Sequence, residues 1–276
     1  MSSELTDLKA ADQAVWAGGD YDQIADHCWE VGAAVAGAVV IEAGMKVLDV
    51  ATGTGSAAIR AAEKGADVVG LDISIEMLEG ARRNAAEAGV EVEWVEGDAQ
   101  ALPFDDDSFD RVLTAFGTIH ATDHDLAASE LVRVCKPGGE IVMANWCLEG
   151  FPGRLLAMLR KHAPAEILAT VAATEWGTHG HPRRQLGGQL VLAIEPGAVA
   201  ITAESSTALL EHYEQHFAPL VAAKASLNEQ RYADLQRELL AWIEELDSGD
   251  GETVVAAPYV LVVGHKPVPD LRPNTA

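Results

Sequence analysis

Residues 47–55 read Val-Leu-Asp-Val-Ala-Thr-Gly-Thr-Gly, an apolar strand followed by a Gly-x-Gly turn that opens a helix. A second apolar stretch, Asp67 to Leu71, ends in Asp72. Gly53 and Gly55 allow a ligand to approach the backbone, because a side chain at either position would hold it away. An acid about twenty residues past the glycines can accept two hydrogen bonds from ribose hydroxyls. This stretch therefore predicts half of a nucleoside-binding site.

Predicted strands and helices alternate on both sides of this stretch. The predicted strands are Lys46 to Val50, Asp67 to Leu71, Glu91 to Val95, Phe109 to Ala115 and Glu140 to Asn145. The predicted helices are Tyr21 to Val40, Ser56 to Lys64, Ser74 to Ala88 and Asp123 to Val134. Ser74 is the expected N-cap of its helix, and Gly89 the expected stop. The alternation predicts an α/β fold with a doubly wound, mostly parallel sheet that has helices on both faces.

The pattern changes after Asn145. The sequence predicts a short helix from Leu155 to His162, one or two strands around Pro196-Gly197, mostly helix over 206–246, and a final strand from Val254 to Val263. No linker is long enough to separate two domains, so 1–276 is expected to form one domain. Its expected parts are an N-terminal helical lid (1–44), a cofactor-binding core (45–146), an inserted cap (147–190) and C-terminal strands and helices (191–276).

The composition argues against several classes of partner. The chain has 276 residues, a net charge of −24 and a pI near 4.5. Nucleic acids and anionic membrane surfaces both require clustered Lys and Arg, so neither is an expected partner. Met1 to Leu8 has no basic and apolar pattern of a secretion signal, and Val31 to Ile41 is too short to span a membrane. Three dispersed cysteines favour a reducing cytoplasmic location and have no metal-ligand spacing.

Two acids bear on which adenosine cofactor binds. Gly53-x-Gly55-x-x-Ala58 also matches the dinucleotide fingerprint, which is weak alone. Asp49, however, precedes the glycines, and a carboxylate there favours the ammonium group of a sulfonium amino acid over a pyrophosphate. Asp98 follows the third predicted strand at the carboxyl edge of the sheet, where it can accept a hydrogen bond from an adenine amino group. Both acids favour S-adenosylmethionine.

Four ordered motifs resemble the class I S-adenosylmethionine-dependent methyltransferases. They are Val47 to Gly55, Asp72, Gly97 to Asp110 and Leu131 to Gly139. The likeness covers roughly 20–147 and is greatest to the branch of the ubiquinone and menaquinone C-methyltransferases. It implies a Rossmann-like sheet of seven strands with an antiparallel last strand, for which Val254 to Val263 is the candidate.

The resemblance also implies which residues contact the cofactor. Asp49, Gly53 and Gly55 would surround the methionine part, and Asp72 would bind the ribose. Ile73 would pack on adenine, with Asp98 and Ala99 at its edge, and the stretch from Ala115 through Phe116 to Gly117 would face the sulfonium. Ala51, Met77 and Gly97 complete the expected set, and Tyr21, with Trp16, is expected to close over the cofactor. The first motif reads Ala51-Thr52 at the two positions where Gly-Cys is commoner in this family.

The acceptor side offers a candidate base and candidate walls. His120 follows the fourth predicted strand, where relatives tend to be apolar, and is the candidate general base for an acceptor that arrives protonated. A histidine held by local hydrogen bonds would explain it equally simply. The candidate acceptor contacts are Trp146, Trp176 and His179. Simple core packing is the alternative explanation for the two tryptophans, and a polar loop is the alternative for the histidine. No metal site is expected.

Three classes of function remain open at this point. The first is methyl transfer to O, N or C of a small-molecule acceptor. The second is a methyltransferase fold whose chemistry has changed, for example to cyclisation. The third is a regulatory protein that holds the cofactor or its product. The sequence does not determine the acceptor or the oligomeric state.

Overall fold

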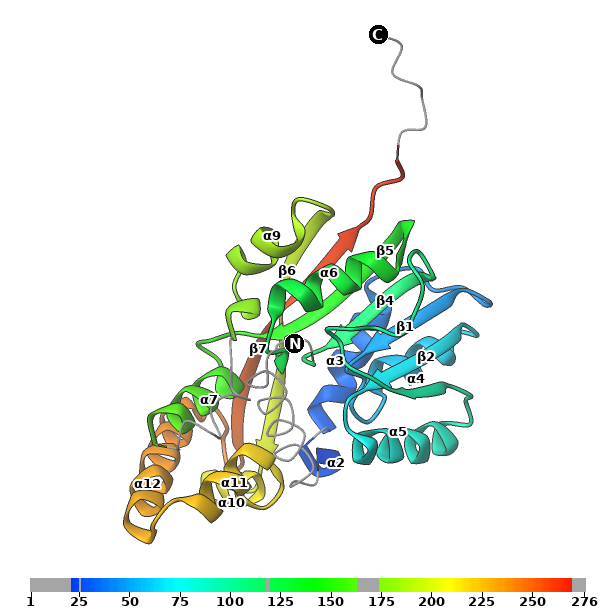
Figure 1. Ribbon diagram of the computed structural model, residues 1–276. Coiled ribbons are helices and arrows are strands. Elements are labelled where there is room, and N and C mark those ends of the chain that lie inside the picture. The colour runs from blue at the N-terminus through cyan, green and yellow to red at the C-terminus, as the bar shows by residue number, and fades with distance from the viewer. Residues whose placement is uncertain (1–20, 25, 118–119, 163–173, 270–276) are drawn as a thin grey trace.

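The computed structural model describes residues 21–24, 26–117, 120–162 and 174–269. Its centre is a seven-stranded sheet in the order β3-β2-β1-β4-β5-β7-β6 (Figure 1). The strands are β1 (Lys46–Val50), β2 (Asp67–Asp72), β3 (Glu93–Glu96), β4 (Phe109–Ala115), β5 (Cys135–Trp146), β6 (Val191–Ala203) and β7 (Thr253–His265). β1 to β5 pair in parallel, and β7 runs antiparallel between β5 and β6. This confirms the predicted mostly parallel sheet with an antiparallel last strand.

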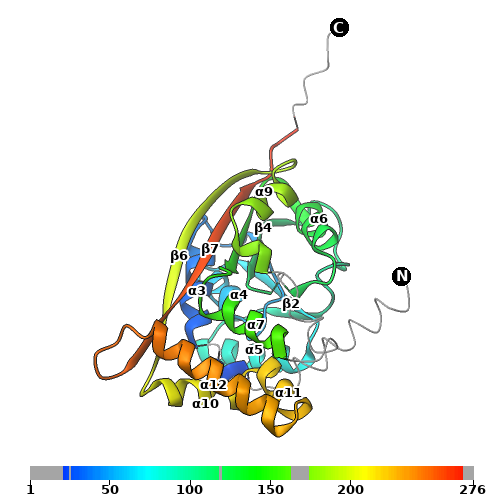
Figure 2. The ribbon, with the colours of Figure 1, turned by 90° about the vertical axis from the view of Figure 1, so that its left-hand side faces the viewer.

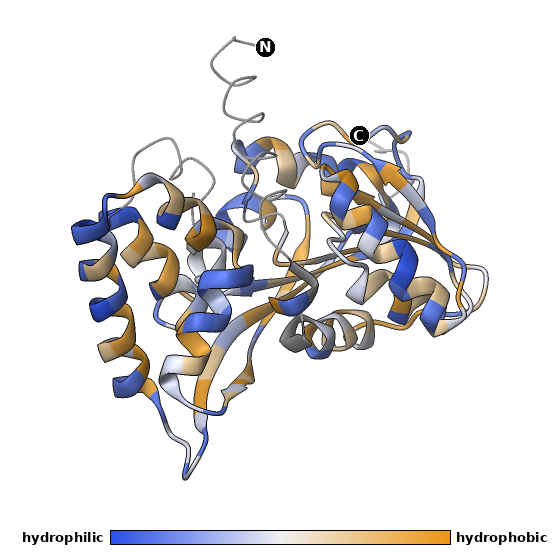
Figure 3. Cartoon of the chain, turned by 90° about the horizontal axis from the view of Figure 1, so that it is seen from below, coloured by the Kyte–Doolittle hydropathy of each residue, from blue (hydrophilic) through white to orange (hydrophobic). Residues whose placement is uncertain are grey.

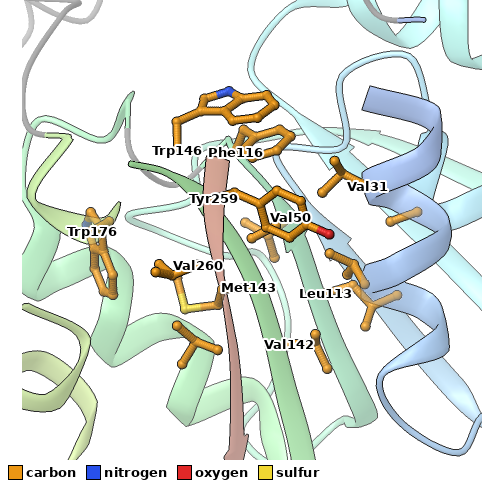
Figure 4. Close-up of a cluster of buried hydrophobic side chains, with 14 of the residues drawn as sticks. Val31, Val50, Leu113, Phe116, Val142, Met143, Trp146, Trp176, Tyr259 and Val260 are labelled. Atoms are coloured by element: carbon orange, nitrogen blue, oxygen red, sulfur yellow. The ribbon is translucent and has the colours of Figure 1, made fainter. Parts of the chain in front are cut away.

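Apolar side chains cover both faces of the sheet. Leu113 pairs with Val142 and Thr114 with Met143, so alternate residues of β4 and β5 point to opposite faces. Figure 4 shows Val31 on the side of Leu113 and Val142, while the ring of another buried residue, Trp176, lies near Met143. Val31 belongs to α3 (Asp26–Gly37), which packs against α4 (Ser56–Ala62). On the other face α6 (His124–Val134) packs against α9 (Gly180–Leu186), next to the 3₁₀ helix η3 (Thr174–Gly177).

Local capping explains where the helices of the first half begin and end. α5 (Ile75–Ala88) begins after Ser74, whose hydroxyl accepts a hydrogen bond from the Met77 amide, and it ends at Gly89 in the left-handed conformation. α6 begins after Asp123, whose carboxylate accepts a hydrogen bond from the Leu126 amide. Each cap satisfies an amide that has no partner within the helix. The predicted cap at Ser74 and stop at Gly89 are confirmed.

Several predicted boundaries are corrected. The predicted helix Tyr21 to Val40 is found as α2 (Tyr21–Ile24) and α3, and the helix predicted to start at Leu155 starts at Phe151. β3 begins at Glu93 instead of Glu91. β5 begins at Cys135 instead of Glu140, because the Gly138 amide donates to the Lys266 carbonyl and extends the pairing. The stretch around Pro196-Gly197 is one strand, β6, at the edge of the sheet, where proline is tolerated.

Two insertions form a helical layer beyond the carboxyl ends of the central strands. α7 (Phe151–His162) lies between β5 and β6. α10 (Ser206–His216), α11 (Ala218–Ser226) and α12 (Glu229–Leu246) lie between β6 and β7. α7 contacts α11 and α12, and α10 contacts α2, so segments far apart in sequence meet here (Figure 2). Figure 3 shows hydrophobic and hydrophilic residues on different sides of these helices, as expected for a layer with one buried face.

Candidate active site

A pocket opens where the carboxyl ends of β1, β2 and β4 meet the two helical insertions. It encloses about 1150 Å³, the open space at its mouth included. Its walls are Ile24, Ala51, Thr52, Gly53, Thr54, Ser56, Asp72, Ile73, Ser74, Met77, Ala115, Phe116, Gly117, His120, Trp146, Pro152, Leu155, Leu156, Tyr213 and Phe217. In open α/β sheets, ligands bind at this edge, where the strand order reverses.

The loop between β1 and α4 forms the floor of the pocket. Gly53 adopts φ 55°, which disfavours a side chain, and its amide donates a hydrogen bond of 2.8 Å to Asp72 Oδ2. A Cβ built on Gly53 meets no other atom within 4 Å. Since Gly53 lines the pocket, this Cβ would occupy space that a ligand can use. The loop therefore fits a ligand that approaches the backbone closely, as predicted for an adenosine cofactor.

Replacing Gly53 with alanine is expected to weaken cofactor binding. The added methyl group would enter the pocket, and the left-handed backbone would cost about 1 kcal/mol of stability. Gly89→Ala is the matched control, because Gly89 has φ 70° and equally open surroundings but caps α5 outside the pocket. Calorimetric titration with S-adenosylhomocysteine should show reduced affinity in the first variant alone. Equal affinities in the two variants would contradict this placement of Gly53.

Asp72 connects two loops at the end of β2. Its Oδ1 accepts the Ser74 amide at 3.0 Å, and its Oδ2 accepts the Gly53 amide. Burial raises the pKa of this carboxyl, while the hydrogen bonds from Ser74 and Gly53 oppose the rise. The carboxylate thus holds the first glycine loop against the start of α5. Each oxygen has further acceptor capacity toward the pocket, which Asp72 lines.

Asp49 lies beneath the loop and does not line the pocket. Its Oδ2 accepts hydrogen bonds from Thr52 Oγ1 at 2.6 Å and from the Ala58 amide at 3.0 Å. Its Oδ1 is buried and accepts no hydrogen bond within the structure. Burial, opposed by these two donors, raises the pKa of Asp49 to about 7. Asp49 therefore shapes the loop from below, and direct contact with a methionine ammonium stays a prediction.

Stability is expected to depend on pH through Asp49. Because its pKa rises from 3.8 to about 7 in the folded protein, the native state binds the proton more tightly than the unfolded chain. Stability is then greatest below pH 3.8 and falls as pH rises toward 7, by about 4 kcal/mol for this group. Asp49→Asn removes this contribution. Its melting temperature should change less than that of wild type between pH 4.5 and 8, and parallel profiles would contradict the assignment.

A second, smaller pocket adjoins the first. It is lined by Gly97, Asp98, Ala99 and Gln100, and it shares Ala51, Ile73, Gly117 and His120 with the larger pocket. Asp98 Oδ1 accepts hydrogen bonds from the backbone amide of Gln100 at 2.9 Å and from the side-chain Nε2 of Gln100 at 3.1 Å. Gln100 Oε1 in turn accepts the Asp123 amide at 2.8 Å. The predicted adenine-side residues are therefore brought together. An extended ligand can occupy both pockets across the shared residues.

Two non-glycine residues at this junction have positive φ. Ala51 adopts φ 52° and Phe116 adopts φ 64°. A Cβ on Gly117 would lie 2.2 Å from Ala51 Cβ, so the loops after β1 and β4 are in direct contact there. Such backbone conformations each cost on the order of 1–3 kcal/mol and are concentrated at ligand sites. This conformation places Phe116 in the pocket wall.

An aromatic pair forms the wall beside β4 and β5. Phe116 and Trp146 are stacked, with ring centroids 3.6 Å apart and planes within 6° (Figure 4). The ring of Tyr259 stands nearly perpendicular to both, with centroid distances of 6.2 and 6.3 Å. Phe116 and Trp146 are 3% and 7% exposed, so the pair is rigidly packed. Trp146 therefore lines the pocket, and its contact with an acceptor stays a prediction.

His120 stands between the two pockets and lines both. Its backbone amide donates to the Gly117 carbonyl at 3.1 Å, which fixes the loop after β4. The side chain is partly exposed to the pocket and lies on the side of Ala115 and Phe116, whose positions the resemblance assigned to the sulfonium. Its position is compatible with the predicted base, and its protonation role stays a prediction.

Two predicted acceptor contacts are corrected. Trp176 is fully buried under α6 and α9, where its ring lies 4.7 Å from that of His181 and 5.8 Å from that of His124. His179 is exposed before α9. Neither lines the pocket. The residue type alone could not separate a core tryptophan from a ligand-binding one, because a large ring suits both positions.

Of the other predicted cofactor residues, one lies outside the pocket wall and two have side chains outside the described part of the chain. Gly55 does not line the pocket; a Cβ there would lie 2.9 Å from Trp94 Cη2, so this glycine makes room for a core ring. Tyr21 begins α2, but its side chain lies outside the described part of the chain, as does all of Trp16. Gln100 was missed, although its position two residues after Asp98 could have indicated it.

The residues from the helical insertions were also missed. Pro152, Leu155 and Leu156 come from α7, and Tyr213 and Phe217 come from α10 and its end. Leu155, Leu156, Tyr213 and Phe217 lie in segments predicted as helix, but no local signal indicated the pocket that these helices cover. Among the described residues, no cluster of His, Cys, Asp and Glu has the geometry of a metal site. In the same part of the chain, no helix is long and apolar enough to cross a membrane.

The sequence is similar to a methyltransferase family model and to known proteins. Residues 47–139 match a family model described as a methyltransferase domain. An uncharacterized protein of Mycobacterium tuberculosis is 35% identical over 264 residues, which cover 94% of this chain and 95% of that protein. The demethylmenaquinone methyltransferase of Thermus thermophilus is 47% identical over 103 residues, 37% of this chain and 47% of that enzyme. The chain belongs to the class I S-adenosylmethionine-dependent methyltransferases, a family of enzymes.

Solved structures share the fold. The YcgJ protein of Bacillus subtilis superposes with a TM-score of 0.59 at 20% identity, over 87% of this chain and all of that one. Phosphoethanolamine N-methyltransferase 2 of Haemonchus contortus, solved with S-adenosylmethionine, superposes with a TM-score of 0.55 at 20% identity. The match covers 87% of this chain and 53% of that one. The cyclase SpnF superposes with a TM-score of 0.55 at 19% identity, over 87% of this chain and 81% of that one. At these identities the likeness concerns the fold alone.

Proposed function

We propose that the protein transfers a methyl group from S-adenosylmethionine to O, N or C of a small-molecule acceptor. The observation that carries this proposal is the joined pair of pockets. The smaller one and the glycine-loop side of the larger one hold every residue assigned to the cofactor whose side chain the structure describes, except Asp49 and Gly55. The remaining side of the larger pocket is left for an acceptor, next to His120 and the Phe116–Trp146 pair.

The residues divide the work between binding and proton transfer. When bound, S-adenosylmethionine supplies a methyl group activated by positive sulfur, and the electron pair of the broken carbon–sulfur bond stays on sulfur. Asp72 and the Gly53 loop hold the adenosine, and Asp98 orients its base. The acceptor's nucleophilic atom forms the new bond to the methyl carbon, and its proton passes to the imidazole of His120. Holding the two reactants in line accounts for up to about 7–11 kcal/mol of the barrier.

We also assign both insertions to the cap. The expected cap, 147–190, supplies Pro152, Leu155 and Leu156, but Tyr213 and Phe217 close the same pocket from the segment between β6 and β7. His212 Nε2 lies 2.8 Å from the Gln23 carbonyl, which ties α10 to α2. The lid, the cap and part of the C-terminal region therefore act together over the acceptor side.

Calorimetry followed by product analysis tests the proposal. The protein should bind S-adenosylmethionine and S-adenosylhomocysteine, and it should convert the first to the second only when an acceptor is present. Mass spectrometry should then find one acceptor carrying an added methyl group. Cofactor binding without methyl transfer across acceptors of all charge classes would contradict methyl transfer and favour altered chemistry or a regulatory role.

A further inference from the structure

We infer that the acceptor is an uncharged, apolar molecule with a flat ring, bound between the Phe116–Trp146 pair and the helices α7 and α10. This inference rests on the proposed function and specifies its substrate class. It concerns the part of the large pocket that the glycine loop and Asp72 do not reach. Three observations support it: the apolar side chains of the wall, the charges around the wall, and the segments of the chain that supply the wall residues.

Apolar side chains make up nearly all of the acceptor wall. Leu155 and Leu156 project from α7, and Phe217 follows α10. They are 3%, 6% and 9% exposed, so their packing is fixed. The Phe116–Trp146 stack supplies the wall beside β4 and β5. A flat apolar ring gains from burial against both surfaces, and aromatic pairs add about 0.5–1.5 kcal/mol beyond the buried area.

On the part of the walls that the structure describes, an anionic acceptor would meet no permanent positive charge. No Lys or Arg is among the described residues that line either pocket. Carboxylates and phosphates are usually held by Arg or Lys, because a buried unpaired charge is costly. The net charge of −24 adds a long-range repulsion against anions.

A cationic acceptor is disfavoured for a different reason. Among the described residues, the carboxylates on the two pocket walls are Asp72 and Asp98, and both lie on the side assigned to the cofactor. The sulfonium of the bound cofactor would repel a second positive charge at the reacting distance. An uncharged acceptor with one ionisable group near His120 satisfies both conditions.

The acceptor wall comes mainly from outside the matched methyltransferase domain. The family model covers 47–139, which includes Phe116 but excludes Trp146 and the two helical insertions. The acceptor class is therefore set by segments of this chain that the family model does not describe.

Three probes with one ring system and different charges test the inference. Naphthol is neutral at pH 7, naphthoate is an anion, and naphthylmethylammonium is a cation. Each is titrated calorimetrically into the protein saturated with S-adenosylhomocysteine. Naphthol should bind at least about tenfold more tightly than either ion, since burying an unpaired charge costs more than 1.4 kcal/mol. Equal or tighter binding of an ion, or no binding of naphthol, would overturn the inference.

A charge placed in the wall should change this preference. Pro152→Arg puts a cation on a half-buried wall position, and Leu156→Arg puts one deeper. Both should favour naphthoate over naphthol relative to wild type. Ala157→Arg adds the same charge to the exposed side of α7 and should not. An unchanged preference in a variant whose melting temperature still rises with S-adenosylhomocysteine would contradict the location.

The cofactor titration separates the two levels of failure. A wild-type protein that does not bind S-adenosylhomocysteine would contradict the proposed function itself. A protein that binds S-adenosylhomocysteine and then prefers a charged probe would contradict only the acceptor class. Each result thus points to one of the two statements.

Discussion

Replacing Asp72 with alanine should lower the affinity for S-adenosylmethionine by about two orders of magnitude. The carboxylate holds the Gly53 and Ser74 amides and faces the pocket, so the variant loses both the expected ribose acceptor and the link between two loops. Hydrogen bonds to a charged group are worth about 1.5–3 kcal/mol each, and 2.7 kcal/mol corresponds to about a hundredfold change. Calorimetric titration with S-adenosylmethionine and S-adenosylhomocysteine measures the effect.

Asp67 provides the matched control for this variant. It occupies the opposite end of β2 and is exposed, so Asp67→Ala removes the same group from the same strand far from the pocket. Its affinity should equal that of wild type. If Asp72→Ala is folded and binds the cofactor as tightly as Asp67→Ala, Asp72 does not hold the ribose, and the cofactor lies elsewhere.

Replacing His120 with alanine should lower kcat by about 10²–10⁴ for an acceptor that must lose a proton. His120 lines both pockets at their junction, so its imidazole is placed to accept that proton. Cofactor affinity is the internal control, and it should fall far less than kcat. The measurement is the rate of S-adenosylhomocysteine formation with the identified acceptor across a range of pH.

The pH profile distinguishes a base from a residue that merely lines the wall. If His120 accepts the proton, the activity of His120→Ala should recover as pH approaches the pKa of the acceptor group, because solvent then supplies the ionised form. If His120 only shapes the wall, the variant should show a raised KM and a pH profile parallel to that of wild type. The second pattern would remove His120 from the proton-transfer step.

The sequence was informative wherever the signal was local. The apolar strand 47–50, the turn at Gly53 and the cap at Ser74 are determined by neighbours within a few residues, and the structure contains all three. Helix and strand alternation then led to the correct sheet, because crossovers between parallel strands have one hand. Boundaries were less accurate where long-range pairing extends a strand, as at Gly138.

The acceptor side was less predictable because it is built by distant contacts. Nothing near Phe217 in the sequence indicates that it meets the loop of Phe116 across one pocket. Trp146 and Trp176 looked alike as sequence positions, yet one lines the pocket and the other packs under α6 and α9. Asp49 was expected beside the cofactor, and its burial beneath the loop depends on Thr52 and Ala58.

The position of β7 has a consequence for how the chain is completed during synthesis. In the sheet as the structure describes it, β6 is the edge strand and pairs with β7 alone, and β7 also covers the edge of β5. Until Thr253 to His265 leaves the ribosome, β6 has no partner strand in the sheet, and the three helices between β6 and β7 are held by their contacts with α2 and α7. The cofactor half can therefore form while the acceptor half is still open.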